Sequence, residues 1–161
     1  MSDPGRPALA GVHHLKLAVS DLAASLEFYE RALGAVRIPA ADHRRTADGS
    51  LYAVLCQVEG LGPLLELRLD PARARAHRGF DPVTVAVPDR AALEAWTAYL
   101  DAHDVPHSGV VTAIRSWLVA FDDPDGNRMR LYSLEEHGPE LAPDETNPWV
   151  AGQDPAEQPR P

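Results

Sequence analysis

The sequence predicts an α+β protein built from two tandem βαβββ modules. Three observations support this fold class. The chain repeats itself at a constant offset of 68 residues, each copy opens with an alternating strand followed by an amphipathic helix, and short strand-like runs follow each helix. With 161 residues and 45% hydrophobic composition, the chain suits one compact domain. One copy, at about 55 residues, buries little core alone, so we expect the two copies to pack together.

The repeat is carried by identical and chemically similar pairs. Residues 12–21 align with residues 80–89 without a gap. Apolar positions alternate in the same way in both copies, as expected for strands with one buried face. The identical pairs are Ala18/Ala86, Val19/Val87, Asp21/Asp89, Ala23/Ala91 and Ala24/Ala92.

An aspartate stands at the predicted start of each helix. The carboxylates of Asp21 and Asp89 are expected to cap free backbone N–H groups there. The first helix is expected to end at Gly34, a common helix stop. Each helix has one apolar face, made by Leu22, Leu26, Tyr29 and Leu33 in the first and by Leu93, Trp96 and Leu100 in the second.

Strand-like runs after each helix complete the modules. They cover residues 35–42, 51–58 and 63–69 in the first copy, and 108–113, 117–121 and 128–134 in the second. Residues 123–127 form a turn signal between the last two runs. The predicted organisation is an N-terminal arm (1–10), a first module (11–69), a linker (70–79), a second module (80–134) and an acidic, proline-rich tail (135–161).

Charge and composition limit the classes of partner. The net charge is −9, of which −6 lies in the tail, and this argues against a nucleic-acid-binding protein. No apolar run approaches the roughly 20 residues of a membrane span, no signal sequence is visible, and the one cysteine, Cys56, cannot form an internal disulfide. We therefore expect a cytoplasmic protein with no nucleic-acid or membrane partner. The tail is too polar to order by itself, and within it Trp149 and Val150 are either solvated or packed on the body or on a second subunit.

Four segments carry a resemblance to a known superfamily. They are HHLKLAVSDLAASLEFYERALG (13–34), LLELRL (64–69), VTVAVPDRAALEAW (83–96) and FDDPDGNRMRLY (121–132). In this order, and with the repeat, residues 11–134 resemble the vicinal oxygen chelate superfamily, which includes glyoxalase I, extradiol dioxygenases and bleomycin-resistance proteins. The resemblance implies curved sheets that form an open cup-shaped mixed sheet, a divalent metal in many members, and a homodimer.

The resemblance also implies four metal-ligand positions, two in each module. In the first module they are His14 and Glu66. In the second they are Pro82, which has no lone pair to donate, and Arg130, a permanent cation. Two ligands hold a divalent ion weakly and a guanidinium repels it, so we expect no tightly bound metal and no other cofactor. We expect Arg130 to pair with Glu66 instead, and His77, in the linker, to be solvated.

Alternation along each strand predicts which side chains share the cup with these positions. They are Lys16 beside His14, Arg68 beside Glu66, and Arg128 and Tyr132 beside Arg130. Converging cations favour a carboxylate, phosphate or phenolate ligand, although each side chain could instead reach only a solvated rim. Trp117 and Phe121 share one strand face, and they form either a stacking wall for an aromatic ligand or part of the core.

Several classes of function stay open at this point. The first is a protein that binds a small anionic or aromatic organic molecule in the cup without a tightly bound metal, with a ligand set of His14, Lys16, Glu66, Arg68, Trp117, Arg128, Arg130 and Tyr132. The second is an enzyme of the same superfamily, a lyase, isomerase or dioxygenase. It would be either metal-dependent through His14 and Glu66 or metal-free with these two residues as a catalytic acid/base pair. A third is a partner-binding subunit that uses its acidic tail.

Overall fold

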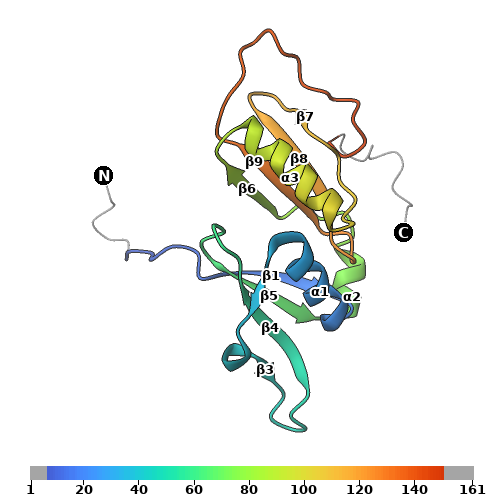
Figure 1. Cartoon of the computed structure of the whole chain (residues 1–161). Coiled ribbons are helices and arrows are strands. Elements are labelled where there is room, and N and C mark those ends of the chain that lie inside the picture. The colour runs from blue at the N-terminus through green and yellow to red at the C-terminus, as the bar shows by residue number, and fades with distance from the viewer. Residues whose placement is uncertain (1–6, 151–161) are drawn as a thin grey trace.

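The computed structural model describes residues 7–150, so the expectations for residues 1–6 of the arm and 151–161 of the tail lie outside it. The first half contains strands β1 (His14–Val19), β2 (Val36–Arg37), β3 (His43–Arg44), β4 (Leu51–Gln57) and β5 (Leu64–Leu69), helix α1 (Leu22–Leu33) and a short 3₁₀ turn, Pro39–Ala41. The second half contains strands β6 (Val83–Val87), β7 (Val111–Thr112), β8 (Trp117–Asp122) and β9 (Arg128–Ser133), and helix α3 (Arg90–Ala102). Figure 1 shows the first half below the second, with α1 at their junction.

The two halves share one topology. The first sheet has the order β1-β5-β4-β2, with β3 also paired to β4, and the second has the order β6-β9-β8-β7. In each sheet the first strand runs parallel to the last, and the other pairs are antiparallel. The prediction of two βαβββ modules in an α+β fold is therefore confirmed.

The helices begin and end where the local sequence predicts. The Asp21 carboxylate accepts a hydrogen bond from the backbone N–H of Ala24 at 3.0 Å, and Asp89 accepts one from Ala92 at 2.7 Å. Helix α1 ends at Gly34, whose φ of 63° lies in the left-handed region that glycine adopts without strain. These caps fix both strand–helix connections of the repeat.

Each sheet buries one face against its helix. The opposite face, here termed the open face, also includes buried residues, Glu66 in the first sheet and Leu118 and Ala120 in the second. In β4, Val54 and Cys56 belong to the buried core. Burial raises the pKa of the Cys56 thiol to about 11, so this thiol stays protonated at neutral pH and is no nucleophile. Phe28 of α1 packs on Phe121 of β8 with ring centroids 6.3 Å apart, and this contact joins the two halves into one core.

The turn between β8 and β9 also joins the halves. The Tyr29 hydroxyl of α1 donates a hydrogen bond to the Asp123 carboxylate at 2.9 Å, and both side chains are buried. The backbone N–H of Ser20, just after β1, donates to the Asp125 carboxylate at 2.9 Å. The turn that the sequence predicts at 123–127 is therefore a contact between the modules as well as a chain reversal.

Several segments differ from the sequence expectation. The strand predicted at residues 35–42 is divided into the two-residue strand β2 and the 3₁₀ turn Pro39–Ala41. The connection between the halves forms helix α2 (Pro71–Ala76), which the sequence analysis did not predict. The described part of the tail packs on the second half. Trp149 and Val150 pack against Tyr132 and the apolar residues of β7 and β8, and the backbone N–H of Asp144 donates to the Thr112 carbonyl at 2.9 Å. Between residues 7 and 150, the helices are all too short or too polar to cross a membrane.

Candidate functional site

The open face of the first sheet gathers four ionisable side chains. Parallel pairing of β1 with β5 places Lys16 directly opposite Glu66, and antiparallel pairing of β4 with β5 places Ala53 opposite Arg68. Because side chains alternate along a strand, His14 lies on this face as well. The structure therefore brings together the first-module part of the ligand set that alternation predicts.

Glu66 is the centre of this group and is only 1% exposed. Arg68 approaches one carboxylate oxygen with Nε and Nη2, each 2.7 Å from Oε1. His14 Nε2 lies 3.0 Å from the other oxygen, Oε2, and Lys16 Nζ lies 4.0 Å from it. A buried carboxylate is tolerated only when its charge is compensated, and these basic side chains compensate it. Glu66 is thus an internal counterion.

The donors that one chain places at this position are fewer than a catalytic metal site uses. Only His14 and Glu66, of the four positions that the resemblance implies, carry metal-ligating groups, and Arg68 and Lys16 already compensate the carboxylate charge. Across residues 7–150 there is no group of three or more His, Cys, Asp or Glu side chains arranged for a metal. Catalytic zinc and non-haem iron sites use three protein ligands, so this donor set falls short of both.

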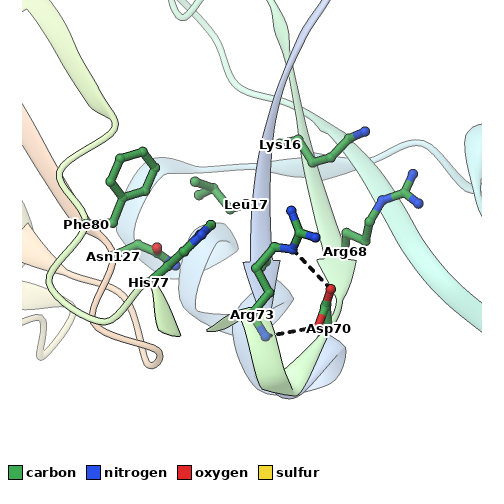
Figure 2. Close-up of a pocket in the computed structure, with 9 residues that line it drawn as sticks. Lys16, Leu17, Arg68, Asp70, Arg73, His77, Phe80 and Asn127 are labelled. Atoms are coloured by element: carbon green, nitrogen blue, oxygen red, sulfur yellow. Dashed lines mark hydrogen bonds and ion pairs between the residues drawn. The ribbon is translucent and has the colours of Figure 1, made fainter. Parts of the chain in front are cut away.

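A cavity of about 390 Å³ lies beside the charged group. Figure 2 shows Lys16 and Arg68 lining it from the sheet, and Arg73 and His77 lining it from α2 and its end. The half-exposed ring of Phe80 supplies an aromatic wall. The cavity therefore combines cationic groups with an aromatic surface.

Arg73, His77 and Phe80 are lining residues that the sequence analysis did not predict as members of a site. Helix α2 begins after Asp70, whose carboxylate accepts a hydrogen bond from the backbone N–H of Arg73 at 3.0 Å, and Pro71 occupies its first turn. The Asp-Pro pair is the sequence signal that could have predicted this helix. Residues 73 and 77 are four positions apart and so lie on the same side of the segment, which faces the cavity.

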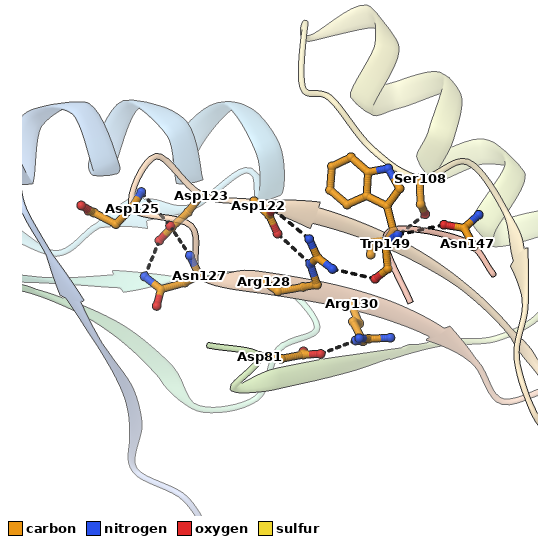
Figure 3. Close-up of polar contacts among 11 residues, drawn as sticks. Asp81, Ser108, Asp122, Asp123, Asp125, Asn127, Arg128, Arg130, Asn147 and Trp149 are labelled. Carbon is orange, nitrogen blue, oxygen red and sulfur yellow. Dashed lines mark hydrogen bonds and ion pairs between the residues drawn. The ribbon is translucent and has the colours of Figure 1, made fainter. Parts of the chain in front are cut away.

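The basic side chains of the second half lie apart from this cavity. Arg130 Nε donates to Asp81 at 2.6 Å (Figure 3), and Arg130 and Tyr132 line a different cavity of about 400 Å³ beside the tail. The two cavities share no lining residue. The expectation that cations of both modules converge in one cavity is therefore wrong within a single chain.

The expected ion pair between Arg130 and Glu66 is also not formed. In β9, Arg130 lies opposite Thr84 of β6, and this register brings Asp81, just before β6, within reach of the guanidinium. Both Glu66 oxygens are meanwhile close to basic groups of the first module. Each half thus compensates its own buried or half-buried charges.

Trp117 packs in the core and lines neither of these cavities. It is 9% exposed and belongs to the same buried cluster as Phe121, whereas the next residue, Leu118, lies on the opposite face of β8. The Arg90 guanidinium and the His137 ring cover the indole at 5.5 and 5.2 Å. The core alternative is therefore the correct one for Trp117, and its assignment to the ligand set is corrected.

The family of the chain follows from this fold and from a direct comparison. The model of the Glyoxalase/Bleomycin resistance protein/Dioxygenase superfamily matches residues 11–131, which includes both modules. The chain belongs to this superfamily.

Relatives of the chain have diverse names. It is 27% identical over 131 residues to a Bacillus subtilis protein named "Putative ring-cleaving dioxygenase MhqA", and this match covers 78% of the chain but 41% of the relative, so the chain spans about two fifths of that protein. Among solved structures, it is similar to TnmS3, an antibiotic-binding protein from Streptomyces sp. CB03234, with a TM-score of 0.60, 19% identity and coverage of 80% of this chain and 98% of that one. It is also similar to a FosX fosfomycin resistance protein from Listeria monocytogenes in complex with Mn(II) and a dihydroxypropylphosphonic acid, with a TM-score of 0.61, 15% identity and coverage of 78% and 93%. The two structures establish the fold alone.

Proposed function

We propose that the protein binds a small anionic organic molecule in the cavity between the first sheet and α2, without a tightly bound metal. The observation that carries this proposal is the balance of charge at the cavity. Three permanent cations, Lys16, Arg68 and Arg73, face two carboxylates, Glu66 and Asp70. One positive charge is left uncompensated, although the chain as a whole carries −9.

The chemistry of the lining favours a carboxylate, phosphate or phenolate group on an aromatic body. Arginine binds planar or tetrahedral anions through two N–H groups at once, and the Phe80 ring offers an apolar surface beside the cations. The proposed site needs no metal, because Arg68 and Lys16 already compensate the negative charge of the Glu66 carboxylate. The antibiotic-binding role in the name of TnmS3 is consistent with a binding function for a protein of this fold.

Isothermal titration with phenyl phosphate tests the proposal directly. The wild-type chain is expected to bind this probe after treatment with a chelator, and Arg68→Ala and Arg73→Ala are each expected to weaken binding about tenfold, or ~1.4 kcal/mol. Arg115→Ala is the matched control, because Arg115 is 73% exposed and pairs with Glu136 away from the cavity. Binding that requires added metal, or equal affinities in all three variants, would reject the proposal.

The second candidate is an enzyme, and one contact favours it. His14 Nε2 and Glu66 Oε2 are 3.0 Å apart, the separation of an acid/base pair, and one relative carries the name of a ring-cleaving dioxygenase. In the metal-free form of this alternative, His14 moves a proton on a bound anion while Glu66 orients the imidazole. Elemental analysis of the purified protein distinguishes the two forms of this enzyme. The metal-dependent form would contain about one metal ion per chain.

The same proposal includes a homodimer. Its support is the position of β1 and β6 at the open edge of their sheets and the exposed apolar side chains of Leu9, Val12 and Phe80 next to them. The tail no longer supports it, because Trp149 and Val150 pack on their own chain.

A further inference from the structure

The tail of this chain covers the open face of the second sheet. Trp149 and Val150 pack against a small apolar cluster on this face, which consists of Val111, Ala113, Leu118, Ala120 and Tyr132. Figure 1 shows the segment before them passing around the second half. The face that corresponds to the charged group of the first half is thus occupied by a side chain of the protein itself.

Arg128 makes two separate contacts with Trp149. Its Nε and Nη2 donate to the two oxygens of Asp122 at 2.8 and 3.0 Å, and this paired geometry fixes the guanidinium plane. Its Cζ lies 5.1 Å from the centroid of the indole ring, which is cation–π distance, and its Nη1 donates to the Trp149 carbonyl at 2.7 Å (Figure 3). Arg128 therefore recognises a flat ring and a hydrogen-bond acceptor at the same time.

The attachment of Trp149 to the sheet is slight. Its backbone N–H donates to the side chain of Asn147, within the tail itself. Among residues 7–150, the Arg128 contact is the hydrogen bond that ties Trp149 to the sheet. Exchange of this residue for a competing molecule would therefore break few bonds of the fold.

The space next to Val150, the residue after Trp149, is hollow. A cavity of about 400 Å³ extends from Val150 over Leu118 and Tyr132 to Arg130, and Asp144 and its neighbours in the tail form its outer wall. Its lining combines apolar residues, such as Leu118 and Val150, with the polar side chains of Thr112, Arg130, Asp144 and Glu145. A molecule longer than one indole ring fits between the sheet and the tail.

We infer that the Arg128–Asp122 pair is a binding platform for a planar aromatic molecule that carries a hydrogen-bond acceptor, and that Trp149 is its exchangeable internal occupant. This site is distinct from the anion cavity of the first half, with which it shares no residue. An incoming ligand stacks on the Arg128 guanidinium, accepts the hydrogen bond that the Trp149 carbonyl accepts otherwise, and extends over Leu118 and Tyr132 as the tail moves outward.

Indole-3-acetamide is the probe for this site, because it has the ring and the carbonyl of Trp149 but no charge to draw it to the anion cavity. In the full chain, Trp149→Ala is expected to raise the affinity for the probe about tenfold, since the competing occupant is gone. Leu141→Ala, in the same tail but away from the platform, is expected to leave the affinity unchanged. Arg128→Lys in the Trp149→Ala background keeps the charge but loses the planar fork, and is expected to abolish the gain.

A second measurement follows the wild-type chain during the titration, and a variant serves only to assign one resonance. When the chain is labelled with 5-fluorotryptophan, Trp149→Phe assigns one of three fluorine resonances. The Trp149 resonance is expected to move as indole-3-acetamide saturates the protein, while those of Trp96 and Trp117 stay in place. A Trp149 resonance that does not move, or an affinity that falls or stays constant in Trp149→Ala, would overturn the inference and assign Trp149 a purely structural role.

Discussion

Glu66 affects both the stability of the fold and the binding properties of the cavity beside it. A carboxylate that is 1% exposed would be an unfavourable burial of charge by itself, but Arg68, His14 and Lys16 surround it with basic groups. The same compensation reduces the attraction of Glu66 for a metal ion and lowers the positive charge available to an anion. Glu66 is therefore the residue at which stability and ligand binding oppose each other.

The substitution Glu66→Gln separates these two effects. It is expected to lower the free energy of unfolding by about 1–3 kcal/mol, because basic groups at a buried position lose their counterion. It is also expected to strengthen the binding of phenyl phosphate several-fold, because the cavity gains positive charge. Urea denaturation and titration calorimetry measure the two, and Glu94→Gln, in an exposed pair on α3, is the control. Weaker binding in Glu66→Gln would mean that Glu66 contacts the ligand directly.

The charged group of the first module was predictable because it depends on one sheet only. Alternation and the β1–β5 pairing are enough to bring Lys16 opposite Glu66. The partner of Arg130 depends on the loop before β6, which supplies Asp81, and alternation carries no information about loops. Trp117 shows the same limit, since its pattern fits a core or a ligand wall equally well until the position of α3 is known.

The β8–β9 turn contains a buried carboxylate whose contribution to stability depends on pH. Burial raises the pKa of Asp123 above its ordinary value of 3.8, while hydrogen bonds from Asn127 and Tyr29 act in the opposite direction. Because the folded-state pKa is raised, this group favours folding most at pH values below the unfolded pKa. Its contribution falls as the pH rises through the folded pKa and is constant above it. Burial raises the pKa of Tyr29 well above 10. Its hydroxyl therefore stays protonated, and remains a donor, over the whole pH range in which Asp123 titrates.

The substitution Tyr29→Phe tests this contact through its pH dependence. At pH 7 it is expected to cost about 1–2 kcal/mol, because an ionised buried carboxylate loses a donor. The cost is expected to shrink as the pH falls through the folded pKa of Asp123, since a protonated carboxyl needs that donor less. Tyr99→Phe is the matched control, because the Tyr99 hydroxyl donates to the neutral carbonyl of Arg31 at 3.0 Å and its loss should cost the same at each pH. If the cost in unfolding free energy depended on pH in the same way for Tyr29→Phe and Tyr99→Phe, the hydrogen bond from Tyr29 to the ionised Asp123 carboxylate would be contradicted.

At the level of elements, α1 and α3 have both a cap and an apolar face in the local sequence, whereas α2 has only the Asp70-Pro71 start signal. Both long helices have an aspartate cap and one apolar face, so their starts are encoded within a few residues. Helix α2 spans six residues and buries only Ala74, so it has almost no apolar face to detect. The packing of the tail depends on Arg128 and on the face of β8 that Trp149 contacts. Both lie far from Trp149 in the sequence.

The whole molecule presents two half-sites of different chemistry. The first half offers a cationic cavity closed by α2, and the second offers an apolar face closed by the tail. Both sheets end in an edge strand, β1 and β6. Exposed apolar side chains stand next to both edges, with Leu9 and Val12 before β1 and Phe80 before β6. Such edges favour association of two copies about a twofold axis.

Light scattering with size-exclusion chromatography is expected to give twice the chain mass of 17.5 kDa at micromolar concentration. Val12→Lys is expected to shift the population toward the monomer, because a charge beside an edge strand opposes pairing. Ile114→Lys is the control, since Ile114 is as apolar and as exposed but lies between β7 and β8, away from both edges. A wild-type monomer would refute the dimer. A dimer that resists Val12→Lys but dissociates in Ile114→Lys would move the interface from the strand edges to the face that the tail covers.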